Sequence, residues 1–122
     1  MDLNLPNGIA WSKDDRFMYL VDTADRIVYA YDFNIETGKI SNRKTLIEFS
    51  DDIIGTPDGM DVDRDGNIWI AMWDGWSIRK YSPTGVLLTI KSVPFPRPTS
   101  CLCLEDPLDR VIVTSARIRI NS

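Results

Sequence analysis

The 122-residue sequence contains no histidine. Without an imidazole, the chain alone cannot supply a Ser-His-Asp or Cys-His nucleophile, or a zinc site with histidine ligands. The glycine patterns of a P-loop, of a dinucleotide-binding fold and of a GxSxG nucleophile turn are also missing. These absences exclude, for this chain by itself, the commonest hydrolase and nucleotide-binding schemes.

Cysteines and long apolar runs are scarce as well. The two cysteines, Cys101 and Cys103, would share one face of a strand, where such close neighbours make a poor disulfide. We therefore expect two small core residues. No apolar run approaches the roughly 20 residues of a membrane span. The first residues lack the basic and apolar segments of a signal peptide, so the sequence predicts a cytoplasmic protein that does not associate with a membrane.

The charge balance is mildly acidic, with 14 Lys and Arg, 18 Asp and Glu, and a net charge of -4. Because no basic patch is available to neutralise phosphates, nucleic acid is not an expected partner. The composition, 43% hydrophobic and 26% charged, is that of an ordinary globular domain.

A pattern of short strands and turns repeats along the chain. Apolar runs rich in strand formers, such as 17–21 and 67–73, are bounded by turn residues and predict buried strands. Pro6, Pro57 and Pro98 open successive units that are 51 and 41 positions apart. Four short strands in a unit of roughly 40–50 residues are typical of a β-propeller blade.

We therefore predict an all-β fold that forms part of a β-propeller, with about two and a half four-stranded blades. One propeller region spans 1–122, with blades at approximately 7–50, 58–93 and 99–117, and the fourth strand of the first blade is expected at 43–49. A partial ring leaves apolar blade faces exposed, and such faces drive association. We expect either a portion of a longer chain or a chain that self-associates through these faces.

A polar residue stands just before the predicted innermost strand of each unit: Asn7, Asp58 and Thr99. Innermost strands line the channel of a propeller, so these residues should surround one channel mouth. The oxygens of Asn7 and Asp58 are hard donors that suit Ca²⁺ or Mg²⁺ and can serve Zn²⁺, although Ca²⁺ takes ~6–8 oxygens. The alternative interpretation is structural, because Pro-Asn-Gly and Pro-Asp-Gly are common turn sequences.

A second acidic stretch, residues 61–66, copies the first half of an EF-hand loop, including the glycine at the sixth place. Met72 stands at the twelfth place, where an EF-hand requires a bidentate Glu, and the flanks have the pattern of strands. This stretch is better interpreted as a turn between the first and second strands of a blade.

The loop Trp73-Asp74-Gly75-Trp76 is expected on the same rim as Asp58. Two indoles around a carboxylate suit a sugar-like ligand, and we therefore predict that Trp73, Asp74 and Trp76 contact substrate. Alternatively, these side chains simply cover the top of the blade.

The ordered series of these motifs, in residues 5–12, 30–43, 57–71 and 98–117, resembles the C-terminal half of the SMP-30/gluconolactonase/regucalcin-like family. The resemblance implies a six-bladed β-propeller that holds one divalent cation in its channel and hydrolyses sugar lactones. Ca²⁺ is the expected cation, with Zn²⁺ or Mn²⁺ as alternatives. By the same resemblance, Asn7 and Asp58 match metal ligands of the family, and Asp58 matches its proton carrier.

The sequence departs from this family by omission. The remaining metal ligand, a Glu, and the sugar-contacting Arg, Asn and Glu of the family belong to blades that would precede Met1. We therefore expect little or no activity from the present chain alone. Two alternatives remain for the function: a calcium-binding propeller without catalysis, and a propeller that binds ligands or proteins.

Overall fold

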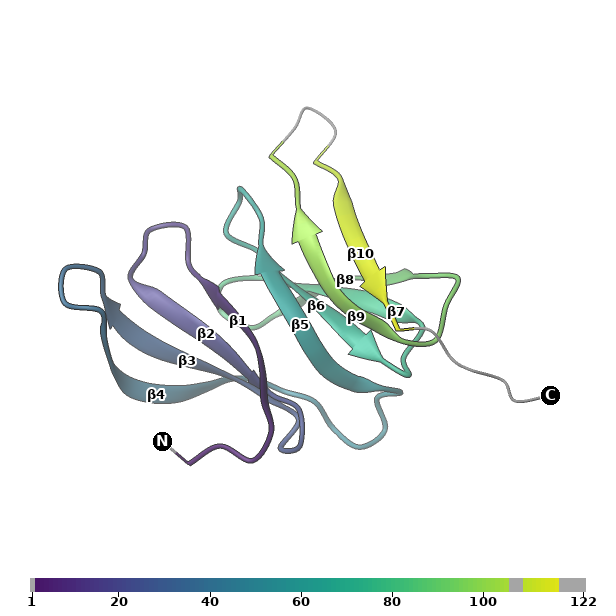
Figure 1. Ribbon diagram of the computed structural model, residues 1–122, viewed down its shortest axis with the longest axis horizontal. Coiled ribbons are helices and arrows are strands. Elements are labelled where there is room, and N and C mark those ends of the chain that lie inside the picture. The colour runs from purple at the N-terminus through teal and green to yellow at the C-terminus, as the bar shows by residue number, and fades with distance from the viewer. Residues whose placement is uncertain (1, 106–108, 117–122) are drawn as a thin grey trace.

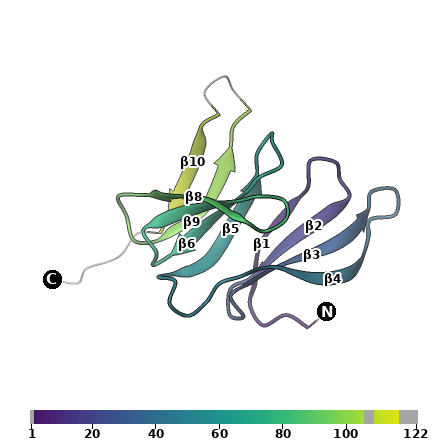
Figure 2. The same cartoon turned by 180° about the vertical axis from the view of Figure 1, so that it is seen from behind.

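The computed structural model describes residues 2–105 and 109–116, and within these residues the chain forms ten strands and no helix. Residue 117, at the end of the predicted third blade, and residues 106–108 lie outside the described residues. Figure 1 shows three sheets that follow one another side by side, and Figure 2 shows the same arrangement from behind. The prediction of an all-β fold built from successive blades is confirmed.

Each sheet is an antiparallel meander in sequence order. The first contains β1 (Pro6–Trp11), β2 (Phe17–Asp22), β3 (Ile27–Asn34) and β4 (Lys39–Glu48). The second contains β5 (Thr56–Val62), β6 (Ile68–Trp73), β7 (Ser77–Tyr81) and β8 (Leu87–Ser92). The third contains β9 (Pro98–Cys103) and β10 (Val111–Ser115).

The fourth strand of the first sheet is longer than predicted. It begins at Lys39, not at residue 43, because Gly38 turns the chain with a φ of 73° and Lys39 pairs at once with Asn34. The β3–β4 pairing contains register shifts. Because of these shifts, β4 stays paired although its polar and apolar residues do not alternate regularly. The sequence pattern does not indicate this part of the strand, because β4 is mostly exposed and therefore contains few buried apolar residues.

The core lies between the first two sheets. Val21 and Val28 from the first sheet and Ile68, Ile70 and Met72 from the second are fully buried in one apolar cluster. Burying a side chain of this size stabilises the fold by about 1.5–3 kcal/mol. The strands β2, β3 and β6 therefore hold the sheets together, and the sequence predicts two of them, β2 and β6, as buried.

A second contact joins β6 to the third sheet. Trp69, Ala71 and Ile78 pack against Cys101 and Cys103. Both cysteines are free thiols, and burial raises the pKa of Cys103 to about 12. They are therefore core residues, as predicted, and at neutral pH they are not nucleophiles.

The innermost strands β1, β5 and β9 approach one another backbone to backbone. A Cβ built on Gly8 would lie 2.7 Å from the carbonyl oxygen of Asp58, and one built on Gly59 would lie 2.6 Å from the carbonyl oxygen of Thr99. Any side chain at these two positions would push neighbouring sheets apart. The glycines thus bring the three polar positions of the predicted channel mouth onto adjacent strands.

Within the part of the chain that the structure describes, no element is a helix of the length and hydrophobicity that spanning a bilayer requires.

Candidate metal and substrate site

The residues predicted at the channel mouth lie inside the innermost strands, not before them. In β1, Pro6 pairs with Asp22 and Ile9 pairs with Leu20, so Asn7 and Gly8 together face a single residue of β2. The ladder of β5 is interrupted in the same way between Pro57 and Met60. Such bulges re-aim the side chain they carry and are frequent beside functional sites.

The third unit repeats this irregularity with different chemistry. In β9, Thr99 is the extra residue, because Pro98 pairs with Ser115 and Ser100 pairs with Thr114. Its hydroxyl lies 2.8 Å from the hydroxyl of Thr114. The three bulges therefore present an amide, a carboxylate and a hydroxyl at equivalent places of adjacent strands.

Among the described residues, Thr23 holds the Asn7 side chain through its amino group. Its Nδ2 donates a hydrogen bond to Thr23 Oγ1 at 3.4 Å. Thr23 Oγ1 in turn donates to the carbonyl oxygen of Pro57 at 2.7 Å. With its amino group engaged, Asn7 keeps the Oδ1 atom, the oxygen that a cation would need.

Asp58 is half-buried, and this burial raises the pKa of its carboxyl group, while the backbone amide of Gly59 opposes the shift. The ion pairs within the described part of the chain join other residues. A partly desolvated carboxylate without a cationic side chain favours a positively charged ligand or a proton.

The donor set fits a divalent cation in kind and is incomplete in number. Amide and carboxylate oxygens are the ligands that Ca²⁺ and Mg²⁺ prefer. Across residues 2–105 and 109–116, however, no three His, Cys, Asp or Glu side chains gather as a potential metal cluster. Asn7 and Asp58 therefore offer part of a coordination shell.

The predicted substrate loop lies at the same end of its sheet as Asp58. Trp73 ends β6 and pairs with Thr56, two residues before Asp58. Trp76 is 53% exposed and has a left-handed φ of 53°. An indole that is largely open to solvent at this rim is available to pack against a sugar ring.

Asp74 forms an ion pair with Arg97, a residue that the sequence pattern did not single out. Arg97 Nε donates to Asp74 Oδ1 at 2.7 Å, and the Arg97 guanidinium lies 4.8 Å from the centre of the Trp73 ring. The one available signal was its place directly before Pro98, in the loop that enters the third unit. Arg97 ties two of the three predicted substrate contacts together.

The EF-hand-like stretch is a turn between β5 and β6. The Asp63 Oδ1 atom accepts from the backbone amides of Asp65 at 3.0 Å and Asn67 at 2.9 Å. The Asp63 Oδ2 atom accepts from Trp69 Nε1 at 2.9 Å. Both oxygens of this carboxylate are used by protein donors, in agreement with a structural turn.

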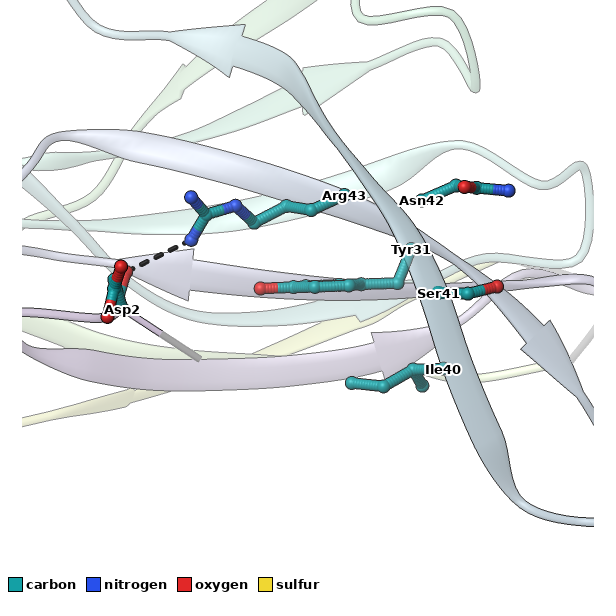
Figure 3. A pocket seen from close by; sticks show the side chains of 6 residues that line it. All are labelled: Asp2, Tyr31, Ile40, Ser41, Asn42 and Arg43. Carbon is teal, nitrogen blue, oxygen red and sulfur yellow. Dashed lines mark hydrogen bonds between the residues drawn. The ribbon is translucent and has the colours of Figure 1, made fainter.

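A separate hollow of about 440 Å³ lies on the outer strands of the first sheet (Figure 3). Its lining residues are Asp2, Tyr31, Ile40, Ser41, Asn42 and Arg43. Figure 3 shows the Arg43 guanidinium reaching Asp2, whose carbonyl oxygen it contacts at 3.0 Å. Because β3 and β4 form this hollow, β2 separates it from β1 and it does not belong to the site around Asn7.

The fold and the site define successive blades of a β-propeller with oxygen donors on the innermost strands. The family model described as the SMP-30/Gluconolactonase/LRE-like region matches residues 1–117. The chain belongs to this family, which confirms the resemblance.

Individual relatives agree with this assignment. The chain is 36% identical over 121 residues to regucalcin of Danio rerio, covering 98% of this chain and 41% of the relative. It is 37% identical over 114 residues to a pentonolactonase of Haloferax volcanii, covering 93% of this chain and 39% of the relative. The chain thus spans less than half the length of these relatives.

A solved structure shows the same fold. The calcium-binding protein regucalcin from Agrobacterium tumefaciens superposes with a TM-score of 0.87 at 28% identity, covering 98% of this chain and 41% of that chain.

Proposed function

We propose that the protein formed by this chain hydrolyses sugar lactones with the help of one divalent cation. The observation that carries the proposal is the half-buried Asp58, whose pKa is raised by burial, on a bulge that adjoins the equivalent bulge of Asn7. The family includes gluconolactonases, and a relative from Haloferax volcanii is a pentonolactonase. Both observations support a lactone as substrate.

In this proposal Asn7 and Asp58 supply two oxygen ligands. Ca²⁺ is the preferred cation, because a solved relative is described as calcium-binding, and Zn²⁺ or Mn²⁺ are alternatives. When bound, such a cation would polarise the lactone carbonyl for attack by water. The remaining ligands are expected from parts of the propeller that correspond to the uncovered length of the relatives.

Asp58 is proposed to carry the proton. A carboxylate whose pKa lies above its ordinary value binds a proton more readily, which suits transfer between water and the ring oxygen of the lactone. Trp73 and Trp76 are proposed to pack against the sugar, with Asp74 held in place by Arg97.

A calcium-binding propeller without catalysis is the second candidate, and the calcium-binding description of the Agrobacterium relative favours it. Self-association is a further proposal, since Leu102 and Ile112 on the third sheet are 53% and 49% exposed. The predictions of a cytoplasmic location and of no nucleic-acid or membrane partner also stand as proposals.

Hydrolysis of gluconolactone and of a pentonolactone separates these functions. The rate should be measured with added Ca²⁺, Zn²⁺ or Mn²⁺, both for the 122-residue chain and for the longest open reading frame that contains it. We expect metal-dependent hydrolysis by the longer protein and little by the chain alone. Tight calcium binding without hydrolysis of either lactone would favour the second candidate.

A further inference from the structure

Thr23 joins Asn7 to the strand that carries Asp58, across two blades. It directly follows β2 of the first sheet, and its hydroxyl contacts both the Asn7 side chain and the carbonyl oxygen of Pro57, the residue before Asp58. Thr23 lies in the turn between β2 and β3. Its contacts link the Asn7 amide to the backbone of the residue that precedes Asp58.

The backbone around Thr23 is firmly held. Its amide donates to the carbonyl oxygen of Leu5 at 2.9 Å. The neighbouring Asp22 is fully buried, and its carboxylate accepts from the backbone amides of Asn4 at 2.8 Å and Leu5 at 3.0 Å. Because these bonds fix the loop to the segment that leads into β1, the strand of Asn7, the hydroxyl is presented from a well-anchored backbone.

Elementary hydrogen-bond chemistry then sets the orientation of Asn7. A threonine hydroxyl has one proton, and the carbonyl of Pro57 can only accept, so Thr23 donates its proton there. Toward Asn7, Thr23 can therefore only accept, and the Asn7 group that faces it must be the amino group. The Oδ1 atom is left turned away from Thr23.

We propose that Thr23 is a positioning residue that orients the Asn7 carbonyl oxygen toward a cation and couples it to the strand of Asp58. This inference rests on the proposed metal site. No other blade position described reproduces the bridge: the equivalent place in the second sheet is Trp73, which ends β6 and carries no hydroxyl.

The test compares Thr23→Val, which removes the hydroxyl at nearly constant volume, with Thr23→Ser, which keeps it. The full 122-residue chain is labelled with ¹⁵N, and the side-chain NH₂ signals of Asn7 are followed without metal and during titration with Mn²⁺ alone. Thr45→Val on the exposed outer strand β4 is the matched control. Thr23→Ala provides a second hydroxyl deletion if the valine variant does not fold.

Loss of the hydroxyl should shift the Asn7 NH₂ signals. It should also weaken Mn²⁺-induced broadening at Asn7 and Asp58 by about fivefold, the factor that corresponds to the free energy of one ordinary hydrogen bond. Thr23→Ser and Thr45→Val should behave like the unaltered chain. Unchanged Asn7 signals in the hydroxyl-free variants, or failure of serine to restore them, would overturn the inference. If these signals respond as expected while the longer protein hydrolyses neither lactone, the lactonase proposal fails and the positioning role stands.

Discussion

The two ends of β5 carry carboxylates with opposite surroundings. Asp63, just beyond Val62, accepts hydrogen bonds from two backbone amides and from the Trp69 indole. Asp58, near the start of the strand, is half-buried with a pKa raised by burial. Protein donors engage both oxygens of the first carboxylate, whereas the second has the backbone amide of Gly59 and is otherwise left to a ligand or a proton. The comparison shows that satisfied hydrogen bonding, not local acidity, distinguishes a structural carboxylate from a candidate functional one.

The two ends of β5 also differ in how closely they pack against neighbouring strands. At the Asp58 end, Gly59 lets β5 and β9 approach until only a hydrogen fits between their backbones. At the Asp63 end, a polar turn leads into β6 and lies at the surface. Substitutions at the first end should therefore alter the assembly of blades and the site, and those at the second should alter local stability.

The largest expected effect is on activity. In the protein that hydrolyses the lactone, Asp58→Asn should lower the rate by about 10²–10⁴-fold, because the amide neither carries the proton nor matches the charge of the cation. Asp65→Asn makes the same charge change in the exposed turn and serves as the control. Initial rates at saturating metal measure both variants. An Asp58→Asn enzyme as fast as the control would remove Asp58 from the mechanism.

A methyl group between the innermost strands should have the next largest effect. Gly59→Ala places its Cβ against Ser100 and against the Thr99 carbonyl oxygen at 2.6 Å, and overpacking of this kind should cost about 3 kcal/mol of unfolding free energy. Gly38→Ala is the control that changes only the backbone conformational preference, since a Cβ built on Gly38 would have no atom within 4 Å. The left-handed φ at this position should cost the alanine variant about 1 kcal/mol of unfolding free energy. Urea denaturation measures the free energy of unfolding of both variants. Equal losses in Gly59→Ala and Gly38→Ala would mean that β5 and β9 can move apart without cost.

At the other end of β5, Asp63→Ala should lower the free energy of unfolding by about 2 kcal/mol, because the substitution leaves the Trp69 indole and two backbone amides without their acceptor. Mn²⁺-induced broadening at Asn7 and Asp58 should stay unchanged. Asp65→Ala, at the exposed tip of the same turn, is the control for stability. Loss of metal binding in Asp63→Ala would show that the turn and the site are coupled.

The smallest effect concerns the pH dependence of stability. Burial raises the pKa of Asp58 in the folded state, so the folded state binds this proton more tightly than the unfolded state does. Protonated Asp58 therefore adds to the free energy of unfolding. This contribution is fully present below the pKa that Asp58 has in the unfolded state, and it is lost as the pH rises through the pKa of the folded state. In the absence of metal, the free energy of unfolding of Asp58→Asn should not decline over this pH range. At neutral pH the variant should be slightly more stable than the unaltered chain.

Chemical denaturation at a series of pH values from about 3 to about 7 brackets the ordinary pKa of a carboxyl group and measures this difference. Asp65→Asn again provides the control for a lost exposed charge. A decline with pH that persists unchanged in Asp58→Asn would place its origin at another residue.

Much of the fold follows from short-range patterns in the sequence. Runs such as 17–21 and 67–73 are apolar on both faces, so they can only be stable as strands covered on both sides, and the structure buries them. The weakly patterned β4 was predicted too short because exposed residues leave little trace of alternation. Asn7 and Asp58 could be singled out because each repeats at the same place of its unit.

The sequence by itself determined the repeat, the buried strands and the candidate oxygen donors, because these depend on residue type and on spacing along one segment. Only the tertiary structure decided which donors are free. It showed Asp63 bound by the Trp69 indole of the next strand, Asp74 paired with Arg97, and Thr23 bridging Asn7 to the strand of Asp58. The first contact forms within one hairpin. The other two join residues of different blades, so their geometry arises only when the sheets pack against one another.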